Sequence, residues 1–343
     1  MARSSAASDA KPDDKKGSTP ASRRAPSRGR IYNDIYETIG GTPLVRASKF
    51  IARHGLEADI LAKLEYFNPM ASIKDRAALA IIEAAEREGR IVPGKTTIIE
   101  ATSGNMSMSL AFIALSKGYK LVLVMPESVS LERRKILIFH GAEVVLTAAE
   151  NGMKGSAEIA KSLLKQRANS WMPDQFTNLN AIKAHAETTA EEIWDDTGGK
   201  ADILVAGVGT AATIIGMAQT LKQKNPAFEV FAVEPAESPV LSGGEPGQHK
   251  IQGIGAGFKP PLLEKAGSVI NGIIQVPSKD AIEMARQVTQ LEGITCGLST
   301  GATFAAALEV ARLPTSKGKT IIVMAASPAE RYVASELFDK IES

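Results

Sequence analysis

The sequence lacks what disulfide-bonded, zinc-binding and membrane-spanning proteins need. It has one cysteine, Cys296, which cannot form an internal disulfide, and four scattered histidines that lack the spacing of zinc ligands. Its longest apolar runs, such as residues 121–125, are far shorter than the ~20 residues that cross a bilayer. No segment with a basic start, an apolar centre and small residues opens the chain as a signal peptide. We therefore expect a metal-free protein of the cytoplasm.

The first 30 residues differ from the rest in charge and composition. They hold eight Lys and Arg against three Asp, whereas the remaining chain is mildly acidic. They contain no Leu, Ile, Val or aromatic residue, so they cannot bury enough apolar surface to offset the entropy of ordering. We expect residues 1–30 to be a disordered basic tail. Because no aromatic side chain accompanies its charges, nothing indicates that this tail binds nucleic acid.

The other 313 residues are enough for about two domains, and they alternate between strand and helix patterns. The expected strands are residues 60–64, 96–100, 121–125, 143–146, 203–206, 230–233 and 320–324. The expected helices are residues 76–86, 108–116, 156–165, 182–195, 214–222, 281–291 and 302–311. Such alternation predicts an α/β fold with mainly parallel sheets and ligands at the carboxyl ends of the strands. Residues 238–261, rich in Gly and Pro, predict a long functional loop.

The first segment that could carry chemistry surrounds Lys74. Ser72 and Asp75 are spaced like a capping box, which places Lys74 in the first turn of a helix. The positive end of a helix disfavours an ammonium group, so a buried Lys74 is suited to react as a free amine. The alternative is a surface lysine that tolerates this position.

Two further segments lie between a strand and a helix, where backbone N–H groups bind anions. Residues 102–105, Thr-Ser-Gly-Asn, suit a carboxylate or a phosphate, although the same residue types form ordinary turns. Residues 207–213, Gly-Val-Gly-Thr-Ala-Ala-Thr, predict a phosphate cradle. The second run also fits the dinucleotide pattern G-x-G-x-x-A, with Glu234 placed where an acid would bind a ribose. A nicotinamide enzyme is therefore an open alternative at this point.

Two glycine-containing segments complete the set. Residues 253–258, Gly-Ile-Gly-Ala-Gly-Phe, predict either a closely approached backbone or a flexible loop. Residues 297–301, Gly-Leu-Ser-Thr-Gly, precede a helix, where Ser299 is either a ligand residue or an N-cap.

The order and spacing of these segments, with several further motifs, are those of one family. The further motifs are residues 39–45 (Ile-Gly-Gly-Thr-Pro-Leu-Val), 125–127 (Met-Pro-Glu), 132–135 (Glu-Arg-Arg-Lys), 152–155 (Gly-Met-Lys-Gly), 175–176 (Gln-Phe), 242–244 (Ser-Gly-Gly) and 249–253 (His-Lys-Ile-Gln-Gly). From about residue 31 to 338, the chain resembles the cysteine synthase (O-acetylserine sulfhydrylase) family of fold-type II pyridoxal-phosphate enzymes. A nucleotide cofactor would leave Lys74 and Ser299 unexplained.

The resemblance implies a fold and a set of contacts. Two α/β domains are expected, each with a mainly parallel sheet, as in the tryptophan synthase β-subunit: residues 47–178 with a movable substrate-loop part, and residues 31–46 plus 179–343, which hold the cofactor phosphate. Lys74 would form the internal aldimine with pyridoxal 5′-phosphate and later move the substrate α-proton. The cofactor would also contact Asn105, Ser299 and a phosphate loop of Gly209, Thr210, Ala211, Ala212 and Thr213. The substrate would contact Thr102, Ser103, Gly104, Asn105, Gln175 and Gly255.

The reaction implied by the resemblance is a β-replacement. Acetate leaves O-acetylserine, an α-aminoacrylate remains on the cofactor, and sulfide adds to give cysteine. A neutral serine at the ring nitrogen makes the ring a weaker electron sink than an aspartate would, which favours elimination. The resemblance also implies a homodimer, and the C-terminal tail of serine acetyltransferase as a partner that binds in the active-site cleft.

The sequence departs from the family pattern at three loops. Ala211 and Ala212 stand at glycine positions of the phosphate loop, and Met106-Ser107 replace Thr-Gly after Asn105. Residues 325–329 read Ala-Ala-Ser-Pro-Ala instead of Leu-Pro-Ser/Asp-x-Gly. A methyl group at 211 costs on the order of 1 kcal/mol if its φ is positive. The main alternative is therefore a diverged paralogue with weak or no catalysis that acts as a binding or regulatory protein, and a less favoured one is an NAD(P)-dependent dehydrogenase.

Overall fold

The computed structural model describes residues 29–339, so the expected tail, residues 1–30, lies almost wholly outside the described part. From Asp34 onward the chain forms one compact unit built on two sheets. The larger sheet has the order β1-β2-β10-β7-β8-β9, in which only β1 runs antiparallel. Its strands are β1 (Leu44–Arg46), β2 (Asp59–Leu64), β7 (Ile203–Gly207), β8 (Glu229–Pro235), β9 (Gly272–Val276) and β10 (Thr320–Ala325).

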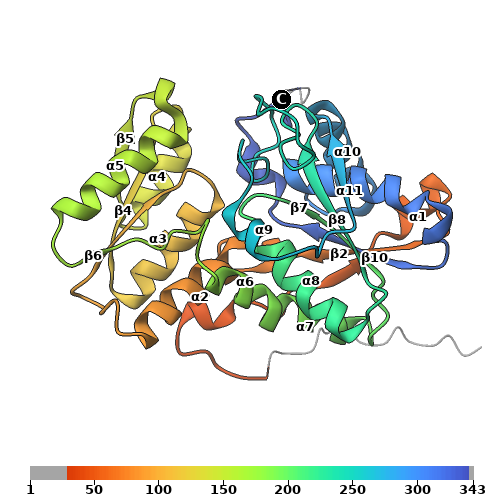
Figure 1. The fold of residues 1–343 in the computed structure, drawn as a ribbon, viewed down its shortest axis with the longest axis horizontal. Helices are drawn as coiled ribbons and strands as arrows, with labels where there is room; N and C mark the ends of the chain where they lie inside the picture. Colours follow the sequence, from red (N-terminus) through yellow and green to blue (C-terminus); the bar gives the residue numbers. More distant parts are fainter. Residues whose placement is uncertain (1–28, 340–343) are drawn as a thin grey trace, which may run out of the picture. The chain divides into compact units, whose positions relative to one another are not determined.

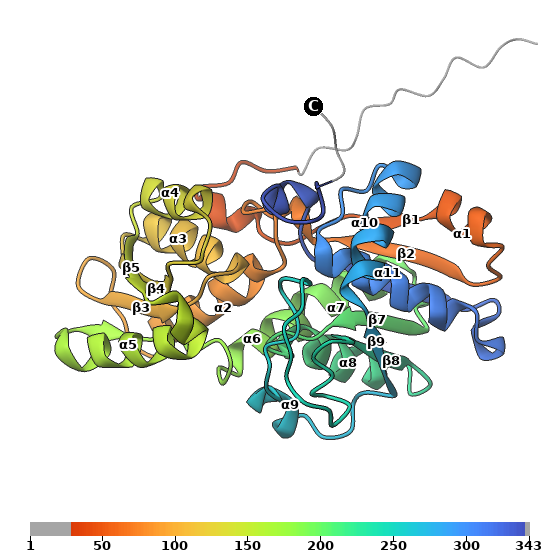
Figure 2. The same ribbon diagram turned by 90° about the horizontal axis from the view of Figure 1, so that it is seen from above.

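Helices cover both faces of the larger sheet, as Figures 1 and 2 show. One face packs against α1 (Ser48–His54), α10 (Ser278–Glu292) and α11 (Leu298–Ala311), with Phe50 and Phe304 in the core between them. The other face packs against α8 (Ala212–Lys224) and a continuous stretch of α6 (Asn180–Ala184), a π-helical turn (His185–Thr189) and α7 (Ala190–Asp196). The short helix α9 (Pro261–Lys265) follows the long loop after β8.

The smaller sheet has four parallel strands in the order β5-β4-β3-β6. They are β3 (Thr97–Ala101), β4 (Lys120–Pro126), β5 (Glu143–Thr147) and β6 (Ser170–Trp171). Successive strand residues point to opposite faces. Leu121, Leu123 and Met125 of β4 therefore face α3 (Asn105–Lys117) and α4 (Leu131–Phe139), whereas Val122 and Val124 face α5 (Gly152–Gln166).

Helix α2 (Lys74–Arg87) lies between the two sheets and joins their cores. Its buried Ile81 and Ile82 belong to one apolar cluster that extends from the larger sheet through α8 to α3 and the smaller sheet. β2 pairs with β10, so residues 59–64 lie in the larger sheet together with strands from residues 203–325. The smaller layer begins only after residue 64, because the β2 segment completes the other sheet.

All seven expected strands and all seven expected helices are present, with ends shifted by a few residues. The elements that the pattern missed are short or lack a clear apolar period: β1, β6, β9, α1, α4 and α9. The sequence did carry a start signal for α4, because serine is a favoured N-cap residue. In the structure, Ser130 is the N-cap, and its hydroxyl accepts a hydrogen bond from the backbone N–H of Arg133. The long loop after β8 has no helix or strand between Pro235 and Pro261, as expected.

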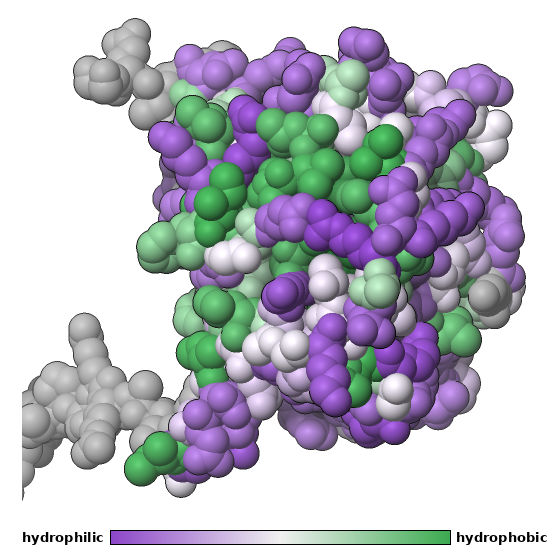
Figure 3. Space-filling model, turned by 90° about the vertical axis from the view of Figure 1, so that its left-hand side faces the viewer, coloured by the Kyte–Doolittle hydropathy of each residue, from purple (hydrophilic) through white to green (hydrophobic). Residues whose placement is uncertain are grey.

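Figure 3 shows the face on the side of the smaller sheet, where apolar side chains gather among charged ones. On α4, Ile138 and Phe139 are 59% and 87% exposed, so they add nothing to the core that positions α3. Over residues 29–339, the helices are all too short or too polar to cross a bilayer.

Candidate active site

Lys74 is the first residue of α2, as the capping pattern predicts. The cap itself differs from the expected box. The Ser72 hydroxyl accepts from the backbone N–H of Lys74 at 3.3 Å, but the Asp75 carboxylate turns away from Ser72. Asp75 accepts instead from the backbone N–H of Met70 at 2.7 Å and from the Ser109 hydroxyl at 2.6 Å. The helix start is therefore tied to α3.

The Lys74 amine has the properties of a reactive group. Burial lowers the pKa of its ammonium to about 8, and no acidic partner lies within reach among residues 29–339. The residue is nevertheless partly exposed, so a ligand can reach Nζ. Ala71, three residues earlier, has a positive φ of 47°, a strained conformation that is often found at functional sites.

A buried cluster of charges fixes the start of α2. The guanidinium of Arg76 donates to both carboxylate oxygens of Glu65, at 2.8 and 2.9 Å, and to both of Glu192, at 2.7 Å each. Lys63 lies 2.9 Å from Glu192, whose pKa is lowered to about 2 by these cations. Because Arg76 follows Lys74 by two residues, this cluster fixes the first turn of α2 and with it the backbone of Lys74.

The loop of residues 102–105 joins β3 to α3, and Asn105 is the first residue of that helix. Its carboxamide is held at both ends: Nδ2 donates to the Tyr332 hydroxyl at 3.4 Å, and Oδ1 accepts from Arg331 at 3.5 Å. Arg331 also donates to the carbonyl of Met70, beside the lysine segment. Arg133 of α4 donates to the carbonyl of Ser103 at 2.6 Å.

The residue after Met106 secures this loop from within. Ser107 donates from its hydroxyl to the carbonyl of Gly104 at 2.6 Å, and its backbone N–H bonds the same oxygen at 3.1 Å. The departure from the family pattern at this point therefore adds a hydrogen bond that a glycine could not make.

The loop of residues 207–213 joins β7 to α8, and its backbone passes very close to residues 253 and 254. A Cβ added to Gly209 would lie 2.7 Å from the carbonyl oxygen of Gly253, so no side chain fits there. Ala211 precedes the helix with φ at 68°, the positive value at which a methyl group is strained. The backbone N–H groups of Gly209, Thr210, Ala211 and Thr213 find no acceptor within the described part of the chain. Free N–H groups at a helix start form an anion site.

Behind this loop, Oγ1 of Thr213 lies 3.1 Å from Nε2 of His185, which also contacts Thr189 through Nδ1. Burial lowers the pKa of His185 to about 3, so its ring is neutral at physiological pH. The charge of Lys74 also contributes to lowering the pKa of His185, after burial and the charge of Arg76.

Ser299 lies on the other side of residue 253. It is the second residue of α11 and not the N-cap, which is Gly297. A Cβ added to Gly253 would lie 3.6 Å from the Ser299 hydroxyl. Gly255, with a φ of 67°, donates from its backbone N–H to the carbonyl of Val208 at 3.0 Å, and so joins the glycine loop to the phosphate loop.

Gln175 follows β6, and its backbone N–H donates to Glu100 of β3 at 3.4 Å. Gln175, Thr102 and Ser299 are 8%, 4% and 5% exposed, and their side-chain polar atoms form no hydrogen bond with residues 29–339. These polar atoms are not fully enclosed within the described part of the chain, so water or a ligand can reach them. The site therefore fits an anionic ligand with several polar atoms. Such a ligand would contact these three side chains, the amine of Lys74 and the free N–H groups of the phosphate loop.

The expected site residues are thus linked mainly through intermediates. His185 contacts Thr213, Tyr332 and Arg331 hold Asn105, and Glu100 connects β3 to Gln175. Sequence reasoning missed these intermediates, because a lone His or Glu on a buried element reads as part of the core. The only signal was position: Glu100 and Arg331 lie within motifs that border the ligand loops.

The alternative of a nucleotide ribose at Glu234 is not supported. Glu234 is 2% exposed, and its carboxylate accepts from the backbone N–H groups of Leu241 and Ser242 at 2.7 and 3.1 Å, and from the Ser242 hydroxyl at 2.5 Å. Its acceptor capacity is therefore used within the chain.

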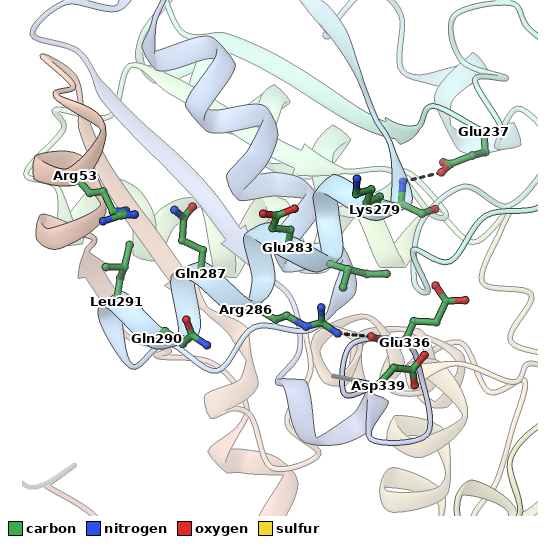
Figure 4. A pocket seen from close by; sticks show the side chains of 12 residues that line it. Arg53, Glu237, Lys279, Glu283, Arg286, Gln287, Gln290, Leu291, Glu336 and Asp339 are labelled. Atoms are coloured by element: carbon green, nitrogen blue, oxygen red, sulfur yellow. Dashed lines mark hydrogen bonds between the residues drawn. The ribbon is translucent and has the colours of Figure 1, made fainter. Parts of the chain in front are cut away.

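A cavity of about 920 Å³ lies elsewhere, between α10 and the C-terminal residues, as Figure 4 shows. Its walls carry Lys279, Glu283 and Asp339, and Arg286 is already bonded to the carbonyl groups of Glu336 and Leu337. It contains none of the expected site residues. A smaller cavity does touch the site, since Gly209 and Gly255 line it.

Comparisons with known proteins agree with this geometry. A family model described as "Pyridoxal-phosphate dependent enzyme" matches residues 35–327. Cysteine synthase 3 of Caenorhabditis elegans is 44% identical over 315 residues, which cover 92% of each chain. Cysteine synthase of Staphylococcus aureus is 46% identical over 307 residues, 89% of this chain and 97% of the relative. The crystal structure of cysteine synthase (OASS) from Entamoeba histolytica matches with a TM-score of 0.89 at 41% identity, covering 93% of this chain and 94% of that one.

Proposed function

Since this chain belongs to the cysteine synthase family of pyridoxal-phosphate-dependent enzymes, we propose that it makes cysteine and acetate from O-acetylserine and sulfide. The observation that carries this proposal is the Lys74 amine, which is desolvated, reachable and without an acidic partner among the described residues. An amine with a pKa of about 8 can react with an aldehyde near neutral pH and can afterwards accept a proton.

The residues of the site fit pyridoxal phosphate. The phosphate would be held by the free N–H groups of Gly209, Thr210, Ala211 and Thr213, at the positive end of α8, where Ala212 begins the helix. The unpaired hydroxyl of Ser299 would face the ring nitrogen, and Asn105 would donate to the ring's 3′ oxygen. Bound pyridoxal phosphate supplies an electron sink for the pair left when the substrate loses its α-proton.

The protein's own groups would do the rest of the chemistry. Lys74 Nζ would accept the α-proton, and acetate would leave the neighbouring carbon before sulfide takes its place. Ser299 is a neutral group, so it leaves the ring nitrogen unprotonated and favours this loss of acetate over a long-lived carbanion. His185, neutral because burial lowers its pKa, would orient the Thr213 hydroxyl without adding charge beside the phosphate.

The substrate carboxylate would bind between two segments of the chain. One is the loop of Thr102, Ser103, Gly104 and Asn105, which leads into α3; the N-terminal end of this helix favours negative charge. The other is Gln175, a mostly buried residue whose carboxamide forms no hydrogen bond within the described residues and stays open to a ligand. Gly255 would line the opposite wall, from the loop joined to Val208. We expect the smaller sheet and its loops to move when substrate binds.

The test is cysteine formation by the purified holoenzyme, with Lys74→Ala as the inactive variant and Lys95→Ala, an exposed lysine of the same layer, as the control. We expect the wild type and Lys95→Ala to show the visible absorption of the bound cofactor and to release cysteine. Lys74→Ala should do neither. A wild type that binds the cofactor but forms no cysteine would favour the regulatory paralogue instead.

We further propose that the enzyme is a cytoplasmic homodimer, and that the C-terminal tail of serine acetyltransferase binds in its active-site cleft. The single Cys296 is buried, which suits a reducing compartment. Sedimentation of the holoenzyme gives the oligomeric state, and a monomer would refute the dimer. Competition between a serine acetyltransferase tail peptide and O-acetylserine tests the partner, since a peptide bound in the cleft must displace the substrate.

A further inference from the structure

Glu100 is a buried carboxyl group that the proposed chemistry does not use. It lies on β3, is 4% exposed and has no cationic partner among residues 29–339. Its two oxygens accept from the backbone N–H groups of Asp174 and Gln175, at 3.0 and 3.4 Å. Burial, with a smaller contribution from the charge of Asp174, raises the pKa of Glu100 to about 8, although the two backbone N–H groups act to lower it. A group that is so costly to bury calls for a physical reason.

The reason lies in the way β6 ends. β3 pairs with β6 only at Thr97 with Ser170 and Ile98 with Trp171. Continued by two residues, this register would bring Pro173 opposite Glu100. Because proline has no N–H, the ladder cannot continue there. The side chain of Glu100 supplies the acceptors that the β3 backbone would otherwise have given to the next two residues.

The turn that Glu100 holds is strained. Asp174 has a positive φ of 50°, and its carbonyl accepts from Thr177 and Asn178. Without the two bonds from Glu100, Asp174 could relax toward an extended backbone, which would swing the next side chain away. That next side chain is Gln175, whose carboxamide forms no hydrogen bond within the described part of the chain and is accessible to a ligand.

Glu100 also lies two residues before Thr102, so both side chains leave β3 on the same face. Thr102 is itself 4% exposed, and its N–H bonds the carbonyl of Val124 at 3.1 Å, which keeps the strand register up to the substrate loop. The Glu100 carboxyl group therefore connects β3, which leads into the Thr102–Asn105 loop, with the turn that carries Gln175.

We propose that Glu100 is a positioning residue that sets Gln175 at the correct distance from the Thr102–Asn105 loop, so that the loop and Gln175 both bind the substrate carboxylate. This role rests on the proposed function, because it needs a carboxylate between the loop and Gln175. Glu100 itself touches neither substrate nor cofactor.

The experiment uses the holoenzyme and the variant Glu100→Gln, which keeps the volume and one acceptor but turns an NH2 group toward a backbone N–H. Its control is Glu143→Gln on β5, the same change at an exposed carboxylate paired with Arg167. We expect Glu100→Gln to raise the KM for O-acetylserine by up to about tenfold, the upper end of what one neutral hydrogen bond contributes. The KM for sulfide, kcat and cofactor affinity should change little, and Glu143→Gln should behave as wild type.

Two further measurements separate positioning from a general loss of structure. Hydrogen exchange of the peptide containing residues 172–179 should quicken in Glu100→Gln, while the β4 peptide stays protected. Gln175→Ala should raise the same KM, and the double variant should be no worse than Gln175→Ala, because Glu100 acts through Gln175. Unchanged exchange, an unchanged KM, or KM effects that multiply in the double variant would each overturn the role. A wild type without O-acetylserine turnover would overturn the proposed function and this role with it.

Discussion

Replacing Ala211 by glycine should leave the free energy of unfolding almost unchanged, whereas the same replacement at Ala212 should lower it clearly. Both methyl groups are buried, at 3% and 2% exposure, and the two residues are neighbours at the start of α8. They differ in backbone conformation, because Ala211 has a φ of 68° and Ala212 is the first helical residue. The pair therefore isolates the effect of a methyl group on a left-handed residue.

The magnitudes follow from three contributions. Removing either methyl group loses about 0.8 kcal/mol of apolar burial, and the added freedom of an unfolded glycine costs a further 0.4 to 1 kcal/mol or so. At Ala211 alone, relief of the left-handed strain returns roughly 1 to 2 kcal/mol. We thus expect a net change near zero for Ala211→Gly, and a loss of roughly 1 to 2 kcal/mol for Ala212→Gly.

Urea unfolding of the apoenzymes measures both values without the added stability of a bound ligand. Equal losses at the two positions, with equal m-values, would refute the strain argument. In the holoenzyme, we expect Ala211→Gly to bind pyridoxal phosphate more tightly, because it removes a methyl group that would crowd the phosphate. Unchanged cofactor affinity would show that the loop accommodates the alanine.

Three more results are expected. Burial lowers the pKa of the Lys74 ammonium to about 8, so the neutral amine accumulates as the pH rises through 8. The rate at which the apoenzyme binds pyridoxal phosphate should therefore increase over that range. A rate increase centred above pH 10 would mean that the amine is not desolvated. Arg76→Met should lower the free energy of unfolding by about 3 to 5 kcal/mol, because it leaves buried carboxylates unpaired. In the same urea assay, Arg46→Met, which breaks an exposed ion pair, should lower the free energy of unfolding far less. Thr213→Val should weaken cofactor binding about tenfold, because it removes a loop hydroxyl and leaves Nε2 of His185 without its partner. Equal dissociation constants of the cofactor for the variant and the wild type would contradict this role.

The main elements could be predicted because their apolar periods are strong. β4 alternates between two cores, and α2 buries one side, so both patterns are visible in the sequence alone. β6 could not be found, since a strand of two residues has no period and exists only because β3 lies beside it. The partner of β2 could not be predicted for a related reason: its pattern predicts a strand but not that it pairs with β10, more than 250 residues later in the chain.

The loops of the candidate site could also be predicted, but the groups that hold them could not. Gly209 and Ala211 lie in a strand–loop–helix pattern that marks an anion site in any sequence. His185 and Tyr332, by contrast, act on residues that are 28 and 227 positions away in the chain. Only the folded structure brings them together, so residue type and local spacing carry no trace of these contacts.

The three departures from the family pattern differ in what they do to the molecule. Around residues 325–329, the contacts to the site come mainly from the backbone: the carbonyl of Ala326 accepts from Ile73, and that of Ser327 accepts from Gly297. Such bonds are independent of the side chain, so this change leaves the start of α2 and α11 in place. Ser107 even adds a bond to its loop. Ala211 alone forces a methyl group into a left-handed backbone, and it does so where the cofactor phosphate would bind. If any departure weakens this enzyme, it should therefore act through cofactor affinity, and excess pyridoxal phosphate should restore full activity without any change in the substrate KM.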